Sequence, residues 1–157
     1  MTARAIAALA TLSIALLSGC GSSSSDTSVP GGANPDAVRV IEQWADELRA
    51  GDVIAASERF AIPSVVQNGT PPIRLTDRRE VEAFNRSLPC GAKLTEAIQS
   101  GKFTIATFEL TERPGPGDCG NGVGETAKTA FVIRDALITE WRRVVDVGTP
   151  TTTGPVI

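Results

Sequence analysis

The sequence predicts one α+β domain in which three helices come first and an antiparallel sheet follows. Apolar residues recur at helical spacing as far as about residue 88, and beyond that point they follow the period of two that is typical of strands. Residues 36–147 number roughly 110, which is the usual size of a single domain with one hydrophobic core.

The first expected helix begins at Pro35 and ends at Gly51, which is a helix stop signal. Its buried face is expected to carry Ala37, Val38, Val40, Ile41, Trp44, Ala45 and Leu48. Asp52 is placed to cap a second, shorter helix. That helix is expected to carry Phe60 and to stop at Pro63, because proline disfavours the helical conformation in the residue before it.

A short strand is expected at residues 64–67, where Asn68-Gly69 follows as a dipeptide that favours a turn. A third helix is predicted from Asp77 to Leu88, because Asp77 and Glu80 have the spacing of a capping box. The buried face of this helix is expected to carry Val81, Phe84 and Leu88.

Four β-rich runs complete the domain, and turn or loop residues separate them. The runs cover residues 92–99, 102–111, 125–133 and 138–147. The loop from Arg113 to Gly124 is rich in glycine and proline, and we expect it to form part of the rim of a cavity.

Several residues within this order of elements point to a known fold. They are Trp44, Gly51, Asp52, Val81, Phe84 and the closing hairpin at residues 131–141. On these residues the domain resembles the nuclear transport factor 2-like superfamily, although many members have glycine where Ala136 stands. The resemblance implies a cone in which a strongly bent, mostly antiparallel sheet wraps three N-terminal helices and encloses a cavity.

A narrower resemblance involves the segment Leu88-Pro89-Cys90-Gly91, the pair Thr107-Phe108 and Cys119. These residues are similar to those of exported actinobacterial members of the superfamily. This resemblance implies export and carries no implication about activity.

The N-terminus has the pattern of an export signal. Arg4 precedes an apolar stretch that closes with Leu17-Ser18-Gly19-Cys20, and the stretch is too short for a permanent transmembrane helix. The pattern resembles the lipobox of bacterial lipoproteins. That resemblance implies that residues 1–19 are a cleaved signal peptide and that acyl chains on Cys20 anchor the protein to the extracytoplasmic side of the cell membrane. The alternative is that Cys20 is an ordinary thiol after a cleaved signal.

Residues 20–35 are expected to form a flexible tether behind this anchor, because serine, glycine and other small polar residues dominate them. A coil of about fifteen residues reaches about 20 Å. The threonine-rich and proline-rich segment 148–157 is expected to be a disordered tail.

Cys90 and Cys119 are the two cysteines that remain if Cys20 is lipidated, and an exported domain meets an oxidising compartment. We therefore predict that they form a disulfide. A metal site or a catalytic thiol is the alternative, but the chain has no histidine and neither cysteine lies in a Cys-x-x-Cys pair. No metal or cofactor is expected.

The charge of the chain argues against nucleic acid as a partner. The formal net charge is −3, and it becomes more negative once Arg4 leaves with the signal peptide. Basic residues form no run longer than a pair, at Arg78-Arg79 and Arg142-Arg143. Such a surface would repel phosphates.

The catalytic sets that the superfamily resemblance implies are incomplete in this chain. Ketosteroid isomerases combine an acidic base with a tyrosine, and polyketide cyclases combine histidine with aspartate, whereas this chain has neither tyrosine nor histidine. Limonene epoxide hydrolases use an Asp-Arg-Asp set, but Arg134 and Asp135 are adjacent in a turn and point apart. No catalytic residue is assigned.

Cavity-lining residues are expected among the aromatic side chains and the last strand. The candidates for ligand binding are Trp44, Phe60, Phe84, Phe108, Phe131, Glu140 and Trp141. Glu140 would act as a base if it were desolvated inside the cavity. The competing interpretations are that Glu140 pairs with an arginine on the sheet surface and that both tryptophans only pack in the core. In strict alternation Ile138, Glu140, Arg142 and Val144 share one face, and Thr139, Trp141, Arg143 and Val145 share the other.

Three hypotheses about function stay open at this point. The first is a membrane-anchored module that binds an apolar small molecule or a protein partner. The second is a cavity enzyme of isomerase or hydrolase type that uses an inward carboxylate such as Glu140. The third is a structural envelope protein that assembles through its sheet, for example as a homodimer. An apolar pocket favours binding, a buried carboxylate beside a polar partner favours catalysis, and a filled interior favours a structural role.

Overall fold

The structure is a computed structural model that describes residues 32–145 of the chain. The predicted signal peptide, Cys20, most of the tether and the predicted tail at 148–157 lie outside the described residues. Within residues 32–145, no helix is long and apolar enough to cross a membrane.

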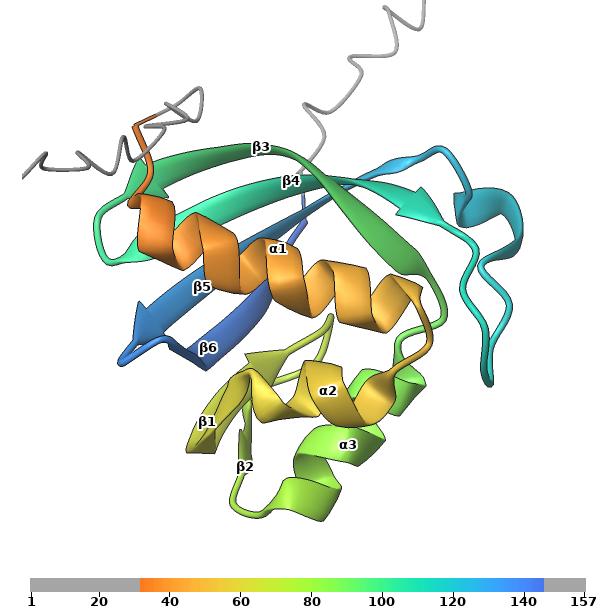
Figure 1. Cartoon of the computed structure of the whole chain (residues 1–157), viewed down its shortest axis with the longest axis horizontal. Helices are drawn as coiled ribbons and strands as arrows, with labels where there is room; N and C mark the ends of the chain where they lie inside the picture. Colours follow the sequence, from red (N-terminus) through yellow and green to blue (C-terminus); the bar gives the residue numbers. More distant parts are fainter. Residues whose placement is uncertain (1–31, 146–157) are drawn as a thin grey trace, which may run out of the picture.

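Three α-helices, six strands and a short 3-10 helix, η1 (Gly120–Gly122), make up the described part (Figure 1). The helices are α1 (Pro35–Arg49), α2 (Val53–Glu58) and α3 (Arg78–Ser87). The strands are β1 (Phe60–Gln67), β2 (Ile73–Leu75), β3 (Gly91–Ser100), β4 (Phe103–Thr111), β5 (Thr126–Arg134) and β6 (Leu137–Val144). The predicted α+β class is therefore confirmed.

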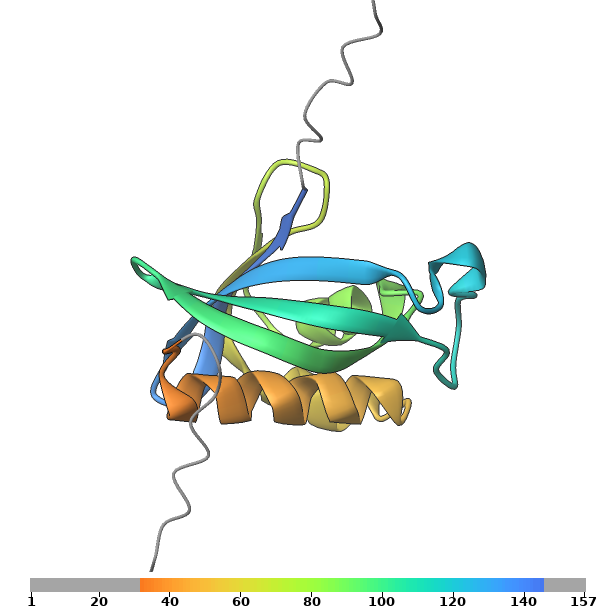
Figure 2. The same cartoon turned by 90° about the horizontal axis from the view of Figure 1, so that it is seen from above.

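All six strands form one sheet in the order β2-β1-β6-β5-β4-β3. Every neighbouring pair is antiparallel except β1 and β6, which are parallel. Figures 1 and 2 show the curved sheet with α1 lying along one of its faces, and α2 and α3 near β1 and β2. The curved sheet leaves a concave side, which the helices cover.

The helix starts follow the polar residues that cap them. Asp52 accepts a hydrogen bond from the backbone N–H of Ala55 at 2.9 Å, and Asp77 accepts one from Glu80 at 3.0 Å, as predicted. The carboxylate of Glu80 in turn accepts from the backbone of Thr76 at 2.6 Å, one residue before the position that a capping box uses.

The residues just before α1 also contact the domain. Gly32 forms an isolated antiparallel bridge with Ile98 of β3, and Ala33 is buried beside Val38 and Ala97. The side chain of Asn34 then caps α1. Two residues of the expected tether, Gly32 and Ala33, therefore lie against the edge of the sheet.

The predicted end of the second helix is wrong. Helix α2 stops at Glu58, and Phe60 already belongs to β1, where it is fully buried and pairs with Ile138 of β6. Pro63 lies inside the strand, at a point where the register between β1 and β6 shifts. Proline is tolerated in a strand at such an irregularity, so tertiary pairing overrides the local helix signal. The short strand β2 was not predicted.

Trp44 of α1 is at the centre of the hydrophobic core. Its ring meets four others edge to face, with centroid distances of 6.4 Å to Phe60, 6.1 Å to Phe108, 5.5 Å to Phe131 and 6.4 Å to Trp141. These four rings come from β1, β4, β5 and β6. Edge-to-face packing contributes free energy beyond the area it buries, so Trp44 fixes α1 against most of the sheet.

The indole N–H of Trp44 also has a polar partner inside the core. It donates to the side-chain oxygen of Asn85 on α3 at 2.8 Å. The amide nitrogen of Asn85 donates to the Ser57 hydroxyl at 3.3 Å and to the Val81 carbonyl at 3.0 Å. Asn85 and Ser57 are fully buried, so these bonds join the three helices where water cannot compete.

We predict that Asn85→Leu lowers the free energy of unfolding by about 2 to 3 kcal/mol, because it leaves the buried Trp44 N–H without an acceptor. Urea denaturation measures this cost. The same substitution in a Trp44→Phe background should cost about 1 kcal/mol less, since the orphaned donor is then gone. Strict additivity of the two substitutions would contradict this account.

Candidate functional site

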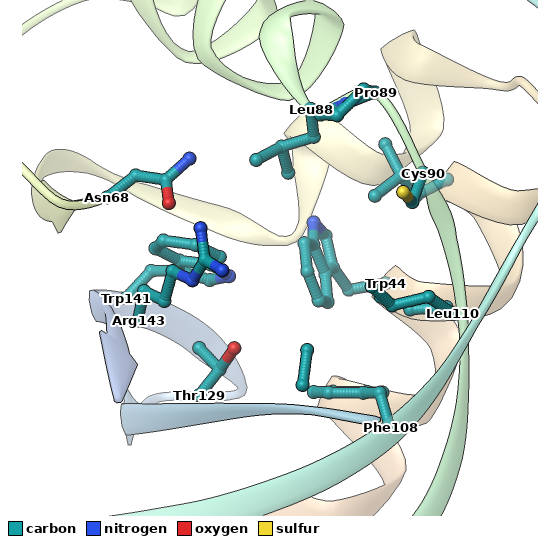
Figure 3. A pocket seen from close by; sticks show the side chains of 13 residues that line it. Trp44, Asn68, Leu88, Pro89, Cys90, Phe108, Leu110, Thr129, Trp141 and Arg143 are labelled. Atoms are coloured by element: carbon teal, nitrogen blue, oxygen red, sulfur yellow. The ribbon is translucent and has the colours of Figure 1, made fainter. Parts of the chain in front are cut away.

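A cavity of about 210 Å³ lies between the second half of α1 and the concave side of the sheet (Figure 3). Most of its lining is apolar or aromatic, and the sequence-distant residues that form it meet only in the folded domain. They are Trp44, Leu48, Asn68, Leu88, Pro89, Cys90, Ala92, Phe108, Leu110, Ala127, Thr129, Trp141 and Arg143.

The alternation of strands explains why three neighbouring strands each supply two lining residues. Side chains at positions i and i+2 of a strand point to the same face. The pairs are Phe108 and Leu110 on β4, Ala127 and Thr129 on β5, and Trp141 and Arg143 on β6. Phe108 pairs with Ala127 and Thr129 pairs with Arg143 across the strands, so the six side chains form one continuous wall.

The structure brings three of the predicted ligand-binding residues to the cavity, namely Trp44, Phe108 and Trp141. Phe60, Phe84 and Phe131 are not among its lining residues. Phe60 packs edge to face on Phe84 at 6.0 Å, and Phe131 packs edge to face on both Trp44 and Phe108 in the core. Whether any of these residues binds a ligand stays a prediction.

The strict alternation expected for the last strand is wrong. The register between β5 and β6 shifts between Val132 and Ile133, so Ile138 and Trp141 are both buried although three positions separate them. The extra residue of such a bulge moves Ile138 off the face that it was expected to share with Glu140. Trp141 and Arg143 do share a face, and this face lines the cavity.

Glu140 does not line the cavity. Its carboxylate instead takes part in an ion-pair network with two residues that are also not in the lining. It accepts from Lys102 Nζ at 2.7 Å and from Arg142 Nε at 2.9 Å. Partial burial alone would raise the pKa of Glu140, but the hydrogen bonds and charges of Lys102 and Arg142 together hold this pKa below its usual value. A carboxylate that stays ionised is a weak base.

The other two carboxylates considered from the sequence also do not line the cavity. Glu96 and Glu109 are exposed. Within the described residues 32–145, the lining includes no carboxylate, and no cluster of three acidic, cysteine or histidine side chains could hold a metal ion. Among residues 32–145, no carboxylate therefore lies in the lining as a candidate for proton transfer.

The predicted disulfide between Cys90 and Cys119 is confirmed, with the two Cα atoms 4.6 Å apart. Cys90 lines the cavity, so the bond ties the loop at 113–124 to the cavity wall. The loop itself contributes none of the lining residues.

Arg113 provides a second link between this loop and the helices. Its side chain is buried, and Nη2 donates to the backbone carbonyls of Asn85 and Arg86 at 3.3 and 3.1 Å, at the C-terminal end of α3. Burial lowers the pKa of the Arg113 guanidinium. The carbonyls at the end of a helix carry partial negative charge, which offsets part of the cost of burying this cation.

Most of the polar lining residues were not among the sequence candidates. Arg143 was placed on the same face of the last strand as Trp141, but it was not chosen because nothing in the sequence shows which face of this strand lies on the concave side of the sheet. Asn68 was assigned only to a turn, and Thr129 only to a strand. The signal that would have found two of them is the i+2 spacing from Trp141 to Arg143 combined with the cross-strand position of Thr129.

No family model matches the sequence, and no curated protein matches it either. Solved structures do match. A polyketide-cyclase candidate from Sinorhizobium meliloti superposes with a TM-score of 0.52 at 19% identity, over 68% of this chain and 94% of that chain. An NTF2-like protein of unknown function from Cytophaga hutchinsonii has a TM-score of 0.52 at 10% identity, over 68% and 87% of the two chains.

A protein with a ketosteroid isomerase-like fold from Catenulispora acidiphila, solved with trimethylamine, has a TM-score of 0.51 at 14% identity and covers 73% of this chain and 88% of that chain. Identities this low carry information about the fold alone. The described domain thus has the cone-shaped fold of nuclear transport factor 2-like proteins, as the sequence predicted.

We predict that the double variant Cys90→Ser/Cys119→Ser loses about 2 to 4 kcal/mol of stability, because the bond closes a loop between cysteines 29 positions apart. Urea denaturation of the variant and of the parent protein, each with and without reductant, measures the loss. Reductant should lower the midpoint of the parent protein only. Equal midpoints in all four samples would contradict a stabilising disulfide.

Proposed function

We propose that this chain is a membrane-anchored, extracytoplasmic binding protein whose cavity holds a small apolar molecule. The observation that carries the proposal is the cavity itself, which has mainly apolar walls and, within residues 32–145, no carboxylate. A cone filled by its own side chains would favour a structural role, and a buried carboxylate would favour catalysis. The apolar cavity favours binding over both.

The size of the cavity limits the ligand. A dry cavity of about 150 Å³ is enough for benzene, and pockets for drug-sized ligands span about 300 to 1,000 Å³. The 210 Å³ cavity lies between these values. We therefore expect a ligand somewhat larger than benzene, with a single ring or a short branched chain.

The position of the cavity suits a protein that is anchored at its N-terminal end. The predicted tether leads into α1 at Pro35, whereas Trp44 and Leu48 line the cavity from the second half of that helix. A rise of 1.5 Å per residue places Leu48 about 20 Å along the helix from Pro35. In the proposed arrangement, the cavity lies toward the end of α1 that is farther from the tether.

Enzymatic use of the cavity has less support. The expected base, Glu140, has its carboxylate bound by Lys102 and Arg142 and is not a lining residue. Solved structures with this fold carry names from different chemistries, so the fold alone assigns no reaction. A binding role needs only the apolar walls.

We predict that Ala127→Leu weakens the binding of ethylbenzene at least tenfold, because the larger side chain occupies space in the cavity. Both tryptophans of the chain line the cavity, so intrinsic fluorescence reports binding directly. The matched control is Ala83→Leu, the same substitution at an exposed position of α3, which should leave the affinity unchanged. Equal loss in both variants, or in neither, would contradict binding in this cavity.

The anchor has its own test. We predict that Cys20→Ser abolishes retention in the membrane fraction, because it removes the thiol that acyl chains would modify. Detergent partitioning of cell fractions measures this. As the control, Cys90→Ser/Cys119→Ser should remain with the membrane. Unchanged partitioning of the Cys20→Ser variant would overturn the lipoprotein interpretation.

A further inference from the structure

The polar groups of the cavity lie together rather than scattered around its wall. Asn68, Thr129 and Arg143 are the polar lining residues apart from the aromatic Trp141 and the disulfide-bonded Cys90. Figure 3 shows these three side chains on one side of the cavity, with Leu88, Pro89, Cys90 and Leu110 on the opposite side. The cavity therefore has a polar side and an apolar side.

Arg143 is the only charged residue among the described lining residues. No salt bridge or hydrogen bond joins its guanidinium to another residue within 32–145. Its neighbour Arg142 differs in this respect, since it donates to Glu140 and Gln67. A guanidinium has only donors, in a planar fork that matches the two oxygens of a carboxylate.

The other polar groups on this side can donate to the same acceptor. The Thr129 hydroxyl and the Asn68 amide can each supply a donor, and Thr129 pairs directly with Arg143 across the strands. The Arg143 guanidinium has donors and no acceptor, so this polar side of the cavity has more donors than acceptors.

We propose that the ligand is a small amphipathic carboxylic acid. Its apolar body packs against Trp44, Phe108 and Leu88, and its carboxylate binds Arg143 with support from Thr129 and Asn68. The inference rests on the proposed binding function and adds the chemical class of the ligand. One guanidinium at an exposed position balances a single negative charge, which a carboxylate carries at neutral pH.

A matched pair of ligands separates this inference from the proposal on which it rests. The anion 4-ethylbenzoate and the neutral 4-ethylbenzamide have nearly the same shape, so apolar binding alone gives them similar affinities. Titration calorimetry on the full chain carrying Cys20→Ser measures both, and that substitution removes acyl chains that would compete for the cavity. We expect the acid to bind about fivefold to tenfold more tightly, as a partly exposed ion pair allows.

Two arginine variants show whether Arg143 causes the preference. Arg143→Gln should abolish the preference for the acid while binding of the amide persists, which also shows that the variant is folded. Arg142→Gln makes the same change in charge one residue away, on the other face of the strand, and should keep the preference. Raising the salt from about 0.05 to about 0.5 M should reduce the preference in the parent protein, because the ion pair is exposed.

Each outcome bears on a different claim. If the amide binds and the acid binds no better, the carboxylate inference is overturned while the apolar binding function stands. If neither compound binds, the binding function fails together with the inference. A preference for the acid that survives Arg143→Gln would overturn the role of Arg143.

Discussion

The packing and hydrogen bonding of Trp44 constrain the rest of the domain. Its ring contacts rings from four strands, and its N–H donates to Asn85 on α3 at 2.8 Å. The first set of contacts places α1 on the concave side of the sheet, and the hydrogen bond places α3 relative to α1. Because one face of Trp44 also lines the cavity, the residue that organises the core also forms part of the candidate site.

Local signals were sufficient to predict most of the fold. The capping residues Asp52 and Asp77 start their helices as predicted, and the apolar spacing around Trp44 identifies the buried face of α1. The errors occur where long-range pairing decides the structure. Phe60 joins β1 because it pairs with Ile138, and this pairing leaves no trace in the local sequence.

The same limit applies to the candidate site. Trp44, Phe108 and Trp141 were predicted as aromatic candidates, because large apolar side chains in such a fold tend to face inward. Glu140 does not line the cavity, whereas Arg143 does and was not among the candidates. The side of β6 that faces the cavity depends on the curvature of the sheet and on the bulge opposite Val132 and Ile133. The disulfide was predictable without any geometry, from the number of cysteines and from the oxidising compartment that the sequence led us to expect.

The account claims that residues around Trp44 leave a stable, apolar cavity in the folded domain. Crystals of the protein under xenon pressure test this claim most directly, because xenon enters dry apolar cavities and scatters strongly. The account predicts a xenon site between Trp44, Phe108 and Trp141, and no such site in the same region of the Ala127→Leu variant. A collapsed space, or the absence of xenon beside Trp44, Phe108 and Trp141 in the pressurised crystal, would contradict it.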